Sequence, residues 1–331
     1  MEAIRSLVEA TARPEVIGGI GGFGGCFAFD SGRWHRPVLV ASTDGVGTKA
    51  MVAQAVGRYS TIGIDLVAMC ADDLVCMGAE PLFLLDYVAT GRIDPDRMTE
   101  LVGGVARGCR LAGCALLGGE MAEHPGGMPD TGFDLAGFAV GVVERDSMLG
   151  ADRVVAGDVL VGLDSPGLRS NGYSLARHVL LEHAGLALDA PAWPGAQHSL
   201  GEELLVPSVI YASAVLAALR AGEVHAAAHI TGGGIPGNLA RVLPGDCDAL
   251  VDRSTWAVPR IFSEIQRLGD VPPDEMDRVF NLGLGMVLVV SRPAVGEVLA
   301  ALGSAGCSSR VVGRVAHGTG CVRFAEDLGL A

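Results

Sequence analysis

The residues best suited to chemistry near the start of the chain lie in Thr43-Asp-Gly-Val-Gly-Thr-Lys49, directly after an apolar run. Asp44 and Lys49 place a carboxylate and an ammonium five residues apart, and Gly45 and Gly47 allow a ligand to approach the backbone closely or the chain to turn with φ > 0. A carboxylate suits Mg²⁺ and an ammonium suits phosphate oxygens. The stretch indicates a phosphate-bearing ligand held with a divalent cation, although alone it is a weak signal.

Three further carboxylates belong to the segment 61–78, whose apolar residues recur at helical spacing. Asp65 and Asp72 are seven residues apart and are expected on the helix face opposite the apolar one, with Asp73 one step further round. Adjacent like charges repel one another. One interpretation is that a cation holds these carboxylates together with Asp44, and the other is that they form a solvated helix face.

Three glycine clusters also lie at predicted strand ends or before the first strand. They are Gly18–Gly25, Gly118–Gly127 with Glu120 and Glu123, and Thr231–Asn238. The last of these opens a helix, and a helix N-terminus suits an anion. Each cluster alone is more often a turn than a site, but together with the 43–49 stretch they favour ligand binding.

Other kinds of chemistry lack their motifs. The sequence contains no Walker A motif, no clear dinucleotide fingerprint, no H-E-x-x-H and no G-x-S-x-G. The net charge of −14 argues against nucleic acid as a partner. The eight cysteines form no C-x-x-C pair, which indicates reduced, packed thiols and a cytoplasmic protein. Neither a signal peptide nor a membrane span is indicated, so no membrane partner is expected.

The alternation of strand-like and helical stretches predicts an α/β or α+β architecture in two domains, 1–150 and 151–331, with the boundary near 145–157. The expected strands are 38–41, 82–89, 114–118, 134–143, 158–163, 247–251, 286–291 and 311–315. The expected helices are 61–78, 96–112, 171–185, 202–221, 236–242, 257–268 and 292–304.

Eight ordered motifs together carry a family resemblance over nearly the whole chain. They are Arg13–Gly24, Thr43–Lys49, Gly63–Cys70, Gly78–Phe83, Leu117–Glu120, Ser170-Asn-Gly-Tyr-Ser174, His229-Ile-Thr-Gly-Gly-Gly234, and Phe280-Asn281 with Gly283, Gly285 and Met286. The chain resembles the aminoimidazole ribonucleotide synthetase family, the phosphoribosylformylglycinamidine cyclo-ligases of purine synthesis. The wider superfamily includes selenophosphate synthetase and thiamine monophosphate kinase.

The resemblance implies a homodimer in which the N-terminal domains build a shared β-barrel-like sheet flanked by helices, and a C-terminal α/β sandwich domain. ATP, with Mg²⁺, would bind near the dimer interface and the ribonucleotide substrate between the domains. ATP would phosphorylate the amide oxygen of the substrate, and a neighbouring nitrogen would then close the imidazole ring.

The resemblance also implies site residues. Asp44 and Asp73 would hold Mg²⁺ and ATP, and Lys49 and Glu120 would line the phosphate site. The remaining nucleotide contacts would come from Gly45, Gly47, Thr48, Asp65, Asp72, Gly118 and Gly119. The substrate would meet Ser170, Asn171, Thr231, Gly232, Gly233, Gly234 and Asn281. The candidate catalytic residues are Asp44, Lys49, Asp73, Glu120 and Arg169.

The chain also departs from the family pattern. It begins about twenty residues late, and Arg5 stands for a lysine, Asp72 for an asparagine and Met121 for a threonine. Arg169 replaces a histidine, which would exchange an acid–base group for anion recognition unless the residue is a solvated loop position. A cyclo-ligase, a paralogue that activates another amide, and a nucleotide-binding relative without catalysis therefore remain three readings.

Overall fold

The computed structural model describes residues 2–19 and 21–325, which gather into two compact units. The first unit combines the chain up to Leu74 with Ala79–Ser147 and Leu188–Ala212. The second combines Val75–Gly78, Met148–Ala187 and the chain from Ser213 onward. Both units contain a sheet and helices, which confirms the expected mixed α/β class with two domains. No helix in the described part of the chain has the length and apolar character needed to cross a bilayer.

The first unit is built on a four-stranded sheet with the strand order β3-β6-β4-β5. Adjacent strands in this sheet run antiparallel, except for β4 and β5, which run parallel and are joined by a helix. Its strands are β3 (Pro37–Gly45), β4 (Glu80–Thr90), β5 (Ala115–Glu123) and β6 (Phe133–Glu144). Strands β1 (Val16–Ile17) and β2 (Cys26–Phe27) form a separate antiparallel pair. The helices are α1 (Glu2–Glu9), α2 (Lys49–Val56), α3 (Ile62–Cys76), α4 (Pro95–Ala112) and α6 (Leu200–Leu204), with 3₁₀ turns at Ser31–Arg33 and Arg145–Ser147.

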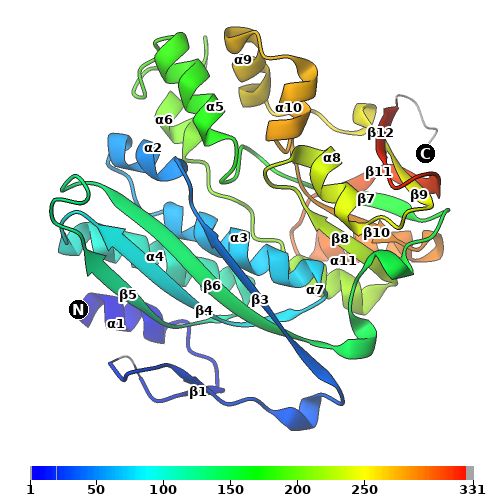
Figure 1. Cartoon of the computed structure of the whole chain (residues 1–331), viewed down its shortest axis with the longest axis horizontal. Helices are drawn as coiled ribbons and strands as arrows, with labels where there is room; N and C mark the ends of the chain where they lie inside the picture. Colours follow the sequence, from blue (N-terminus) through cyan, green and yellow to red (C-terminus); the bar gives the residue numbers. More distant parts are fainter. Residues whose placement is uncertain (1, 20, 326–331) are drawn as a thin grey trace. The chain divides into compact units, whose positions relative to one another are not determined.

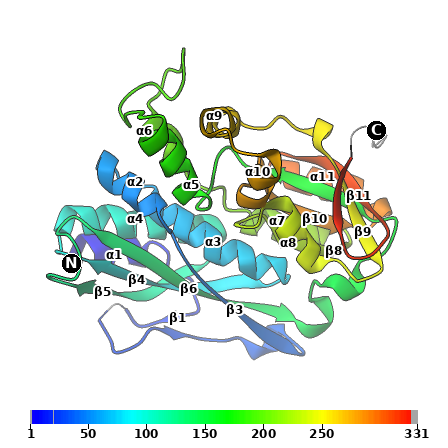
Figure 2. The ribbon, with the colours of Figure 1, turned by 45° about the horizontal axis from the view of Figure 1, so that its top comes forward.

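Helices α3 and α4 lie against the same face of this sheet (Figures 1 and 2). Glycines allow α3 to approach both α4 and the sheet closely. A Cβ atom on Gly63 of α3 would lie 2.2 Å from the Val105 nitrogen of α4, and one on Gly137 of β6 would lie 3.1 Å from the Leu66 side chain. The glycines of these elements therefore set how closely the helix layer packs on the sheet.

The ends of α4 follow from its sequence. The Asp94 side chain accepts a hydrogen bond from the Arg97 backbone nitrogen, and Pro95 occupies the first turn, where no N–H is needed. Gly113 ends the helix with φ 74°, a left-handed conformation that glycine adopts without steric cost.

The second unit contains a six-stranded sheet with the order β12-β9-β11-β7-β10-β8, in which all pairs are antiparallel except β12 with β9. The strands are β7 (Val159–Asp164), β8 (Val224–His229), β9 (Cys247–Asp252), β10 (Leu284–Val290), β11 (Ser309–His317) and β12 (Val322–Ala325). The helices are α5 (Tyr173–Arg177), a π-helical continuation (His178–His183), α7 (Ala212–Ala221), α8 (Gly234–Leu239), α9 (Arg260–Gly269), α10 (Pro273–Val279) and α11 (Val295–Ser304). Short 3₁₀ turns span Ala151–Arg153, Ala240–Val242, Arg253–Thr255 and Arg292–Ala294.

All eight strands expected from the sequence are present, but one expected helix is wrong. The segment 202–221 forms α6 and α7, and residues 205–211 between them are not helical. Pro207 has no N–H, and the backbone nitrogens of Ser208 and Tyr211 donate instead to Asp65 and Asp72 of α3. The sequence analysis did not predict helices α1, α2 and α10 or strands β1, β2 and β12, which are short or lack strong periodicity.

A buried ion pair holds the segment 205–211 in place. The Lys49 ammonium lies 2.8 Å from Asp65 Oδ2 and donates to the Val206 carbonyl at 2.8 Å. The other oxygen of Asp65 accepts from both the backbone nitrogen and the hydroxyl of Ser208. Both charged side chains are fully buried. Because a buried charge is tolerated only when it is paired, each partner requires the other.

The substitution Lys49→Met should destabilise the protein by about 3–5 kcal/mol, because it leaves the Asp65 carboxylate buried without its counter-ion. Urea unfolding monitored by circular dichroism measures the change. The double variant Lys49→Met/Asp65→Asn removes the stranded charge and keeps acceptor capacity toward Ser208, so it should recover much of the loss. Equal stability of the single and double variants would contradict this account of the pair.

Candidate active site

Two acidic side chains come together where β3 ends. Asp44 is the penultimate residue of β3 and Asp73 lies on α3, and both are exposed. The Ser42 hydroxyl donates to Asp73 Oδ2 at 3.1 Å, and the Gly45 nitrogen donates to Asp44 Oδ1 at 2.7 Å. Burial, followed by the charges of Asp44 and Asp73, raises the pKa of the Cys70 thiol to about 12. Two accessible carboxylates beside one thiol therefore share this corner of the first unit.

The loop after Asp44 turns directly into α2. Gly47 has φ 55° and Thr48 occupies the N-cap position of the helix. Gly45, Gly47 and Thr48 thus present backbone to the same corner as Asp44. Lys49, expected to line the phosphate site, is fully buried instead, and its ammonium meets Asp65.

The three carboxylates of α3 separate into two kinds. Asp65 and Asp72 are fully buried, and Asp72 Oδ1 accepts from the Tyr211 nitrogen at 2.8 Å. The expectation of a solvated face is therefore wrong for both residues, since α3 is buried on nearly all sides. Asp73 alone of the three is exposed.

No group of three or more metal-ligating side chains occurs within residues 2–19 and 21–325. Two carboxylates nevertheless match the usual protein share of a Mg²⁺ site, whose other ligands are water and phosphate oxygens. The pair Asp44 and Asp73 therefore fits Mg²⁺ through the chemistry of its donors.

The glycines of β5 lie above a buried carboxyl group. Gly118 and Gly119 precede Glu120, which is exposed and accepts a hydrogen bond from the Met121 nitrogen at 2.8 Å. A Cβ atom on Gly119 would lie 1.8 Å from Asp86 Oδ1 on the neighbouring strand β4. Glycine at 119 thus leaves the space that the Asp86 side chain fills. Burial raises the pKa of Asp86 to about 7, and its Oδ2 makes no hydrogen bond within the described chain.

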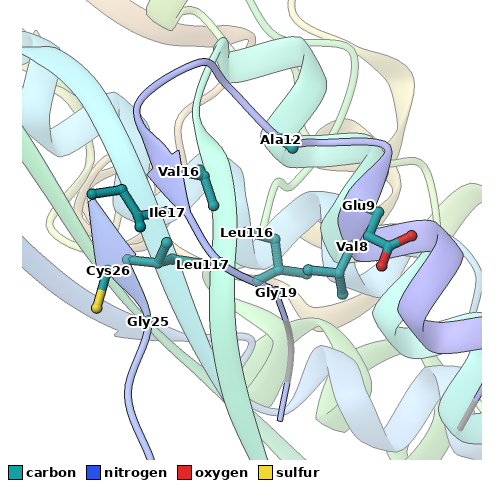
Figure 3. A pocket seen from close by; sticks show the side chains of 11 residues that line it. Val8, Glu9, Ala12, Val16, Ile17, Gly19, Gly25, Cys26, Leu116 and Leu117 are labelled. Carbon is teal, nitrogen blue, oxygen red and sulfur yellow. The ribbon is translucent and has the colours of Figure 1, made fainter. Parts of the chain in front are cut away.

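The early glycine cluster borders a pocket in the first unit (Figure 3). Gly18, Gly19 and Gly25 line it together with residues of α1 and with Leu116 and Leu117 of β5. A Cβ atom on Gly25 would lie 2.5 Å from the Leu117 side chain. At least this glycine is required by packing, whatever the segment binds.

In the second unit two motifs far apart in sequence meet. Asn171 Oδ1 lies 3.5 Å from the position of a Cβ atom on Gly232, so the Asn171 side chain reaches the 231–234 turn. Gly234 has φ 61° and lies so close to the Asp277 carbonyl that no side chain fits. This turn is then held by Asn238, whose amide donates to the Gly234 carbonyl at 2.8 Å.

Asn281 and Arg169 are both buried near the loop that follows β7. The Asn281 amide donates to the Gly167 carbonyl at 2.9 Å and its oxygen accepts from the Gly283 nitrogen at 2.8 Å. Arg169 has φ 63° and is only 1% exposed, so it is not a solvated loop residue. Its guanidinium lies 2.8 Å from His229 Nε2. In the sequence His229 stands out only as part of the His229–Gly234 motif, and it is the fold that brings its ring to Arg169.

Comparison with known proteins identifies the family. The model of the AIR synthase related protein N-terminal domain matches residues 31–143, and that of the C-terminal domain matches residues 155–325. The chain belongs to this family. The expectation drawn from the ordered motifs is thereby confirmed.

Curated relatives agree with this assignment, and a solved structure shares the fold. The chain is 53% identical over 320 residues to a phosphoribosylformylglycinamidine cyclo-ligase of Myxococcus xanthus, covering 97% of this chain and 92% of that protein. It is 49% identical over 327 residues to the protein of that name from Geotalea daltonii, covering 98% and 94%. The thiamine-monophosphate kinase of Stenotrophomonas maltophilia shares the fold with a TM-score of 0.67 at 19% identity, covering 100% of this chain and 96% of that one.

The raised pKa of Asp86 gives stability a defined pH dependence. The folded protein keeps this proton up to about pH 7, whereas the group ordinarily loses it near 3.8. The folded state therefore binds more protons, and this residue makes the protein less stable as pH rises through that window and levels off above it. Relative to Asp86→Asn, the free energy of unfolding of the wild type should fall by about 2–3 kcal/mol between pH 5 and pH 8.

Denaturant titrations of both proteins at pH 5, 6, 7 and 8 measure this difference. Subtracting the Asn variant removes the contributions of the other titrating groups, provided that both proteins unfold in one transition. Parallel pH profiles for the two proteins would show that Asp86 ionises normally in the folded state.

Proposed function

We propose that the protein is an ATP-dependent cyclo-ligase that converts formylglycinamidine ribonucleotide into aminoimidazole ribonucleotide, with release of ADP and phosphate. The observation that carries the proposal is the extent of the similarity, because relatives of that name are 49–53% identical over 97–98% of the chain. The exposed carboxylate pair and the two meeting motifs of the second unit supply the groups that such a reaction requires.

The chemistry consists of activation followed by ring closure. The terminal phosphoryl group of ATP passes to the amide oxygen of the substrate, which breaks its bond to ADP and creates a good leaving group. The neighbouring nitrogen then bonds to the activated carbon, the carbon–oxygen bond breaks as phosphate departs, and the nitrogen loses a proton. Catalysis of such steps depends mostly on positioning and on neutralising charge.

In this proposal the domain at 1–150 binds ATP. Asp44 and Asp73 hold Mg²⁺, which when bound neutralises charge on the phosphates. The backbone of Gly45, Gly47 and Thr48 lies next to these carboxylates, and the segment 118–120 presents the Glu120 carboxylate. One solved structure of the same fold, a hydrogenase maturation protein HypE, is described as a complex with ATP, at a TM-score of 0.64 and 18% identity.

Lys49 and Asp65 act by holding α2, α3 and the segment 205–211 rather than by touching phosphate, since both are buried. Asp72 is also buried and holds the same segment by accepting a hydrogen bond from the Tyr211 nitrogen.

The domain at 151–331 is assigned the ribonucleotide. The Asn171 side chain reaches the 231–234 turn, whose Thr231 side chain and glycine backbone offer hydrogen bonds to a phosphate or sugar. Ser170 directly precedes Asn171 and is assigned to the same ligand. Asn281 uses its amide within the protein and so shapes the loop instead of contacting the ligand directly.

The face of the first sheet that α3 and α4 leave uncovered carries exposed apolar side chains. Leu39 is 65% exposed, Phe138 43% and Tyr87 42%, and they come from β3, β6 and β4. Exposed apolar side chains gathered on one sheet face are typical of a protein–protein contact. We assign this face to a second copy of the chain in a cytoplasmic homodimer.

Purified protein incubated with ATP, Mg²⁺ and formylglycinamidine ribonucleotide should form ADP and aminoimidazole ribonucleotide in equal amounts. ADP formed only with another amide substrate would indicate a paralogue, and ATP binding without any turnover would indicate a non-catalytic relative.

In the same assay Asp73→Asn should lower turnover at least 100-fold and weaken Mg²⁺-dependent ATP binding. The matched control Glu123→Gln replaces an exposed carboxylate that accepts from the Ile93 nitrogen, and it should retain activity. Equal losses in both variants would refute the assignment of the metal site.

The dimer is tested by placing a charge on the exposed sheet face. Phe138→Glu should convert a dimer into a monomer in sedimentation equilibrium at micromolar concentration, because a buried unpaired carboxylate is costly at an interface. Val258→Glu alters an apolar side chain of similar exposure, 41%, in the second unit and should leave the dimer intact. A monomeric wild type would refute the assignment of this face.

A further inference from the structure

Phe280 contacts both segments that are assigned to the ribonucleotide, the loop 165–172 and the turn 231–234. Its ring fills the space beside Gly172, where a Cβ atom would lie 2.3 Å from the ring. Its carbonyl oxygen would lie 3.0 Å from a Cβ atom on Gly234. Phe280 is only 1% exposed. One buried residue therefore packs against the loop and against the turn.

Two backbone carbonyls of the stretch 280–285 also connect these segments. The Gly283 carbonyl accepts a hydrogen bond from the Ser165 nitrogen at 2.8 Å, and the Gly285 carbonyl accepts one from the Ile230 nitrogen at 3.0 Å. Ser165 begins the loop, and Ile230 directly precedes the turn. The start of each segment is therefore aligned against the same short stretch of the chain.

Leu282 bends this stretch into a strained conformation. Its φ of 49° is a left-handed value that is uncommon for a residue other than glycine. The Leu282 carbonyl accepts a hydrogen bond from Trp256 Nε1 at 2.9 Å. Strain of this kind persists only where the surrounding contacts fix it, and it is frequent at ligand sites.

Asn281 supplies the side-chain contacts that fix the bend. It is the only residue of the stretch 280–285 whose side chain can form hydrogen bonds. Its oxygen accepts from the Gly283 nitrogen and its amide donates to the Gly167 carbonyl, so it joins the bend to the loop. Asn281 is 3% exposed, and water therefore competes little for either contact.

The loop that Asn281 holds contains an unsatisfied polar group. Ser170 is 9% exposed, and its hydroxyl makes no hydrogen bond to any residue that the structure describes. A buried hydroxyl without a partner costs free energy, so its retention favours a role in ligand binding. The neighbouring Asn171 side chain reaches the 231–234 turn. The loop and the turn thus meet beside a group that the protein itself does not satisfy.

We infer that Asn281 is a positioning residue, because it fixes the stretch 280–285 as a brace that sets the spacing between the loop 165–172 and the turn 231–234. It acts through backbone and does not touch the substrate. The effect on a ribonucleotide rests on the proposed function, whereas the linkage of the two segments does not. The direct substrate contact expected from the sequence is the competing role for this side chain.

Hydrogen exchange of the full chain, followed by mass spectrometry, tests the brace without reference to catalysis. In Asn281→Ala, peptides that cover 165–172 and peptides that cover 229–234 should both exchange about tenfold faster, because they lose a common support. Peptides that cover α11, at 295–304, should not change. Faster exchange at 165–172 alone, or at neither segment, would overturn the inference.

The matched control is Asn238→Ala, which removes a second buried asparagine from the same unit. Asn238 donates to carbonyls of the turn only, so its loss should loosen 229–234 and leave 165–172 protected. Faster exchange of both segments in this control would show that loosening spreads without the brace, and it would equally overturn the inference. Asn281→Asp, which keeps the acceptor but has no donor for Gly167 at neutral pH, serves if Asn281→Ala fails to fold and should loosen both segments.

Binding and kinetics then separate positioning from direct contact. Asn281→Ala should raise KM for formylglycinamidine ribonucleotide about tenfold and leave the Kd for ATP unchanged. If Asn281 acts through the loop, the double variant with Asn171→Ala should lose little more kcat/KM than Asn171→Ala alone. Losses that multiply would show an independent contact and refute the positioning role. Should the protein lack cyclo-ligase activity, hydrogen exchange still decides whether the brace exists.

Discussion

The first unit depends on one electrostatic constraint, which is that no charge buried in α3 can remain without a partner. Asp65 lies in the middle of the helix layer, where water does not reach it. Its partners come from α2 and from a segment some 140 residues later in sequence, through Lys49 and Ser208. Because an isolated buried carboxylate is costly, the need to pair Asp65 fixes the path of residues 205–211, which are distant in sequence.

The same helix shows how one step in sequence changes the role of an aspartate. Asp72 is buried and accepts a backbone hydrogen bond, whereas Asp73 turns outward to meet Ser42 beside Asp44. The two residues are about 100° apart round the helix, so one faces the interior and the other the end of β3. The buried and the exposed carboxylate are therefore carried by one helix, and packing of the first holds the second in its place.

The sequence predicted the strands well because their Val-, Ile- and Leu-rich runs end at glycines, as β3 and β4 illustrate. The family resemblance implied that Asp44 and Asp73 hold Mg²⁺, which stays a prediction; the structure places both residues near the thiol of Cys70. The sequence could not predict that Asp65 and Asp72 would be buried, because the amphipathic pattern of α3 does not reveal that a second layer of chain covers its polar side. The break in the expected helix 202–221 also depends on contacts that are distant in sequence, because the backbone N–H groups of residues 208 and 211 donate to the carboxylates of Asp65 and Asp72. Arg169 likewise gave no local sign that its partner would be an imidazole from another strand.

Lys49 is the only lysine in the sequence, and the other 23 basic residues are arginines. Its ammonium is fully enclosed and engaged with Asp65. Reagents that acylate amines therefore find no lysine on the surface of the folded protein. An adduct at Lys49 can form only when the segment 205–211 has moved aside. The rate of Lys49 acylation therefore reports how often this part of the chain opens locally.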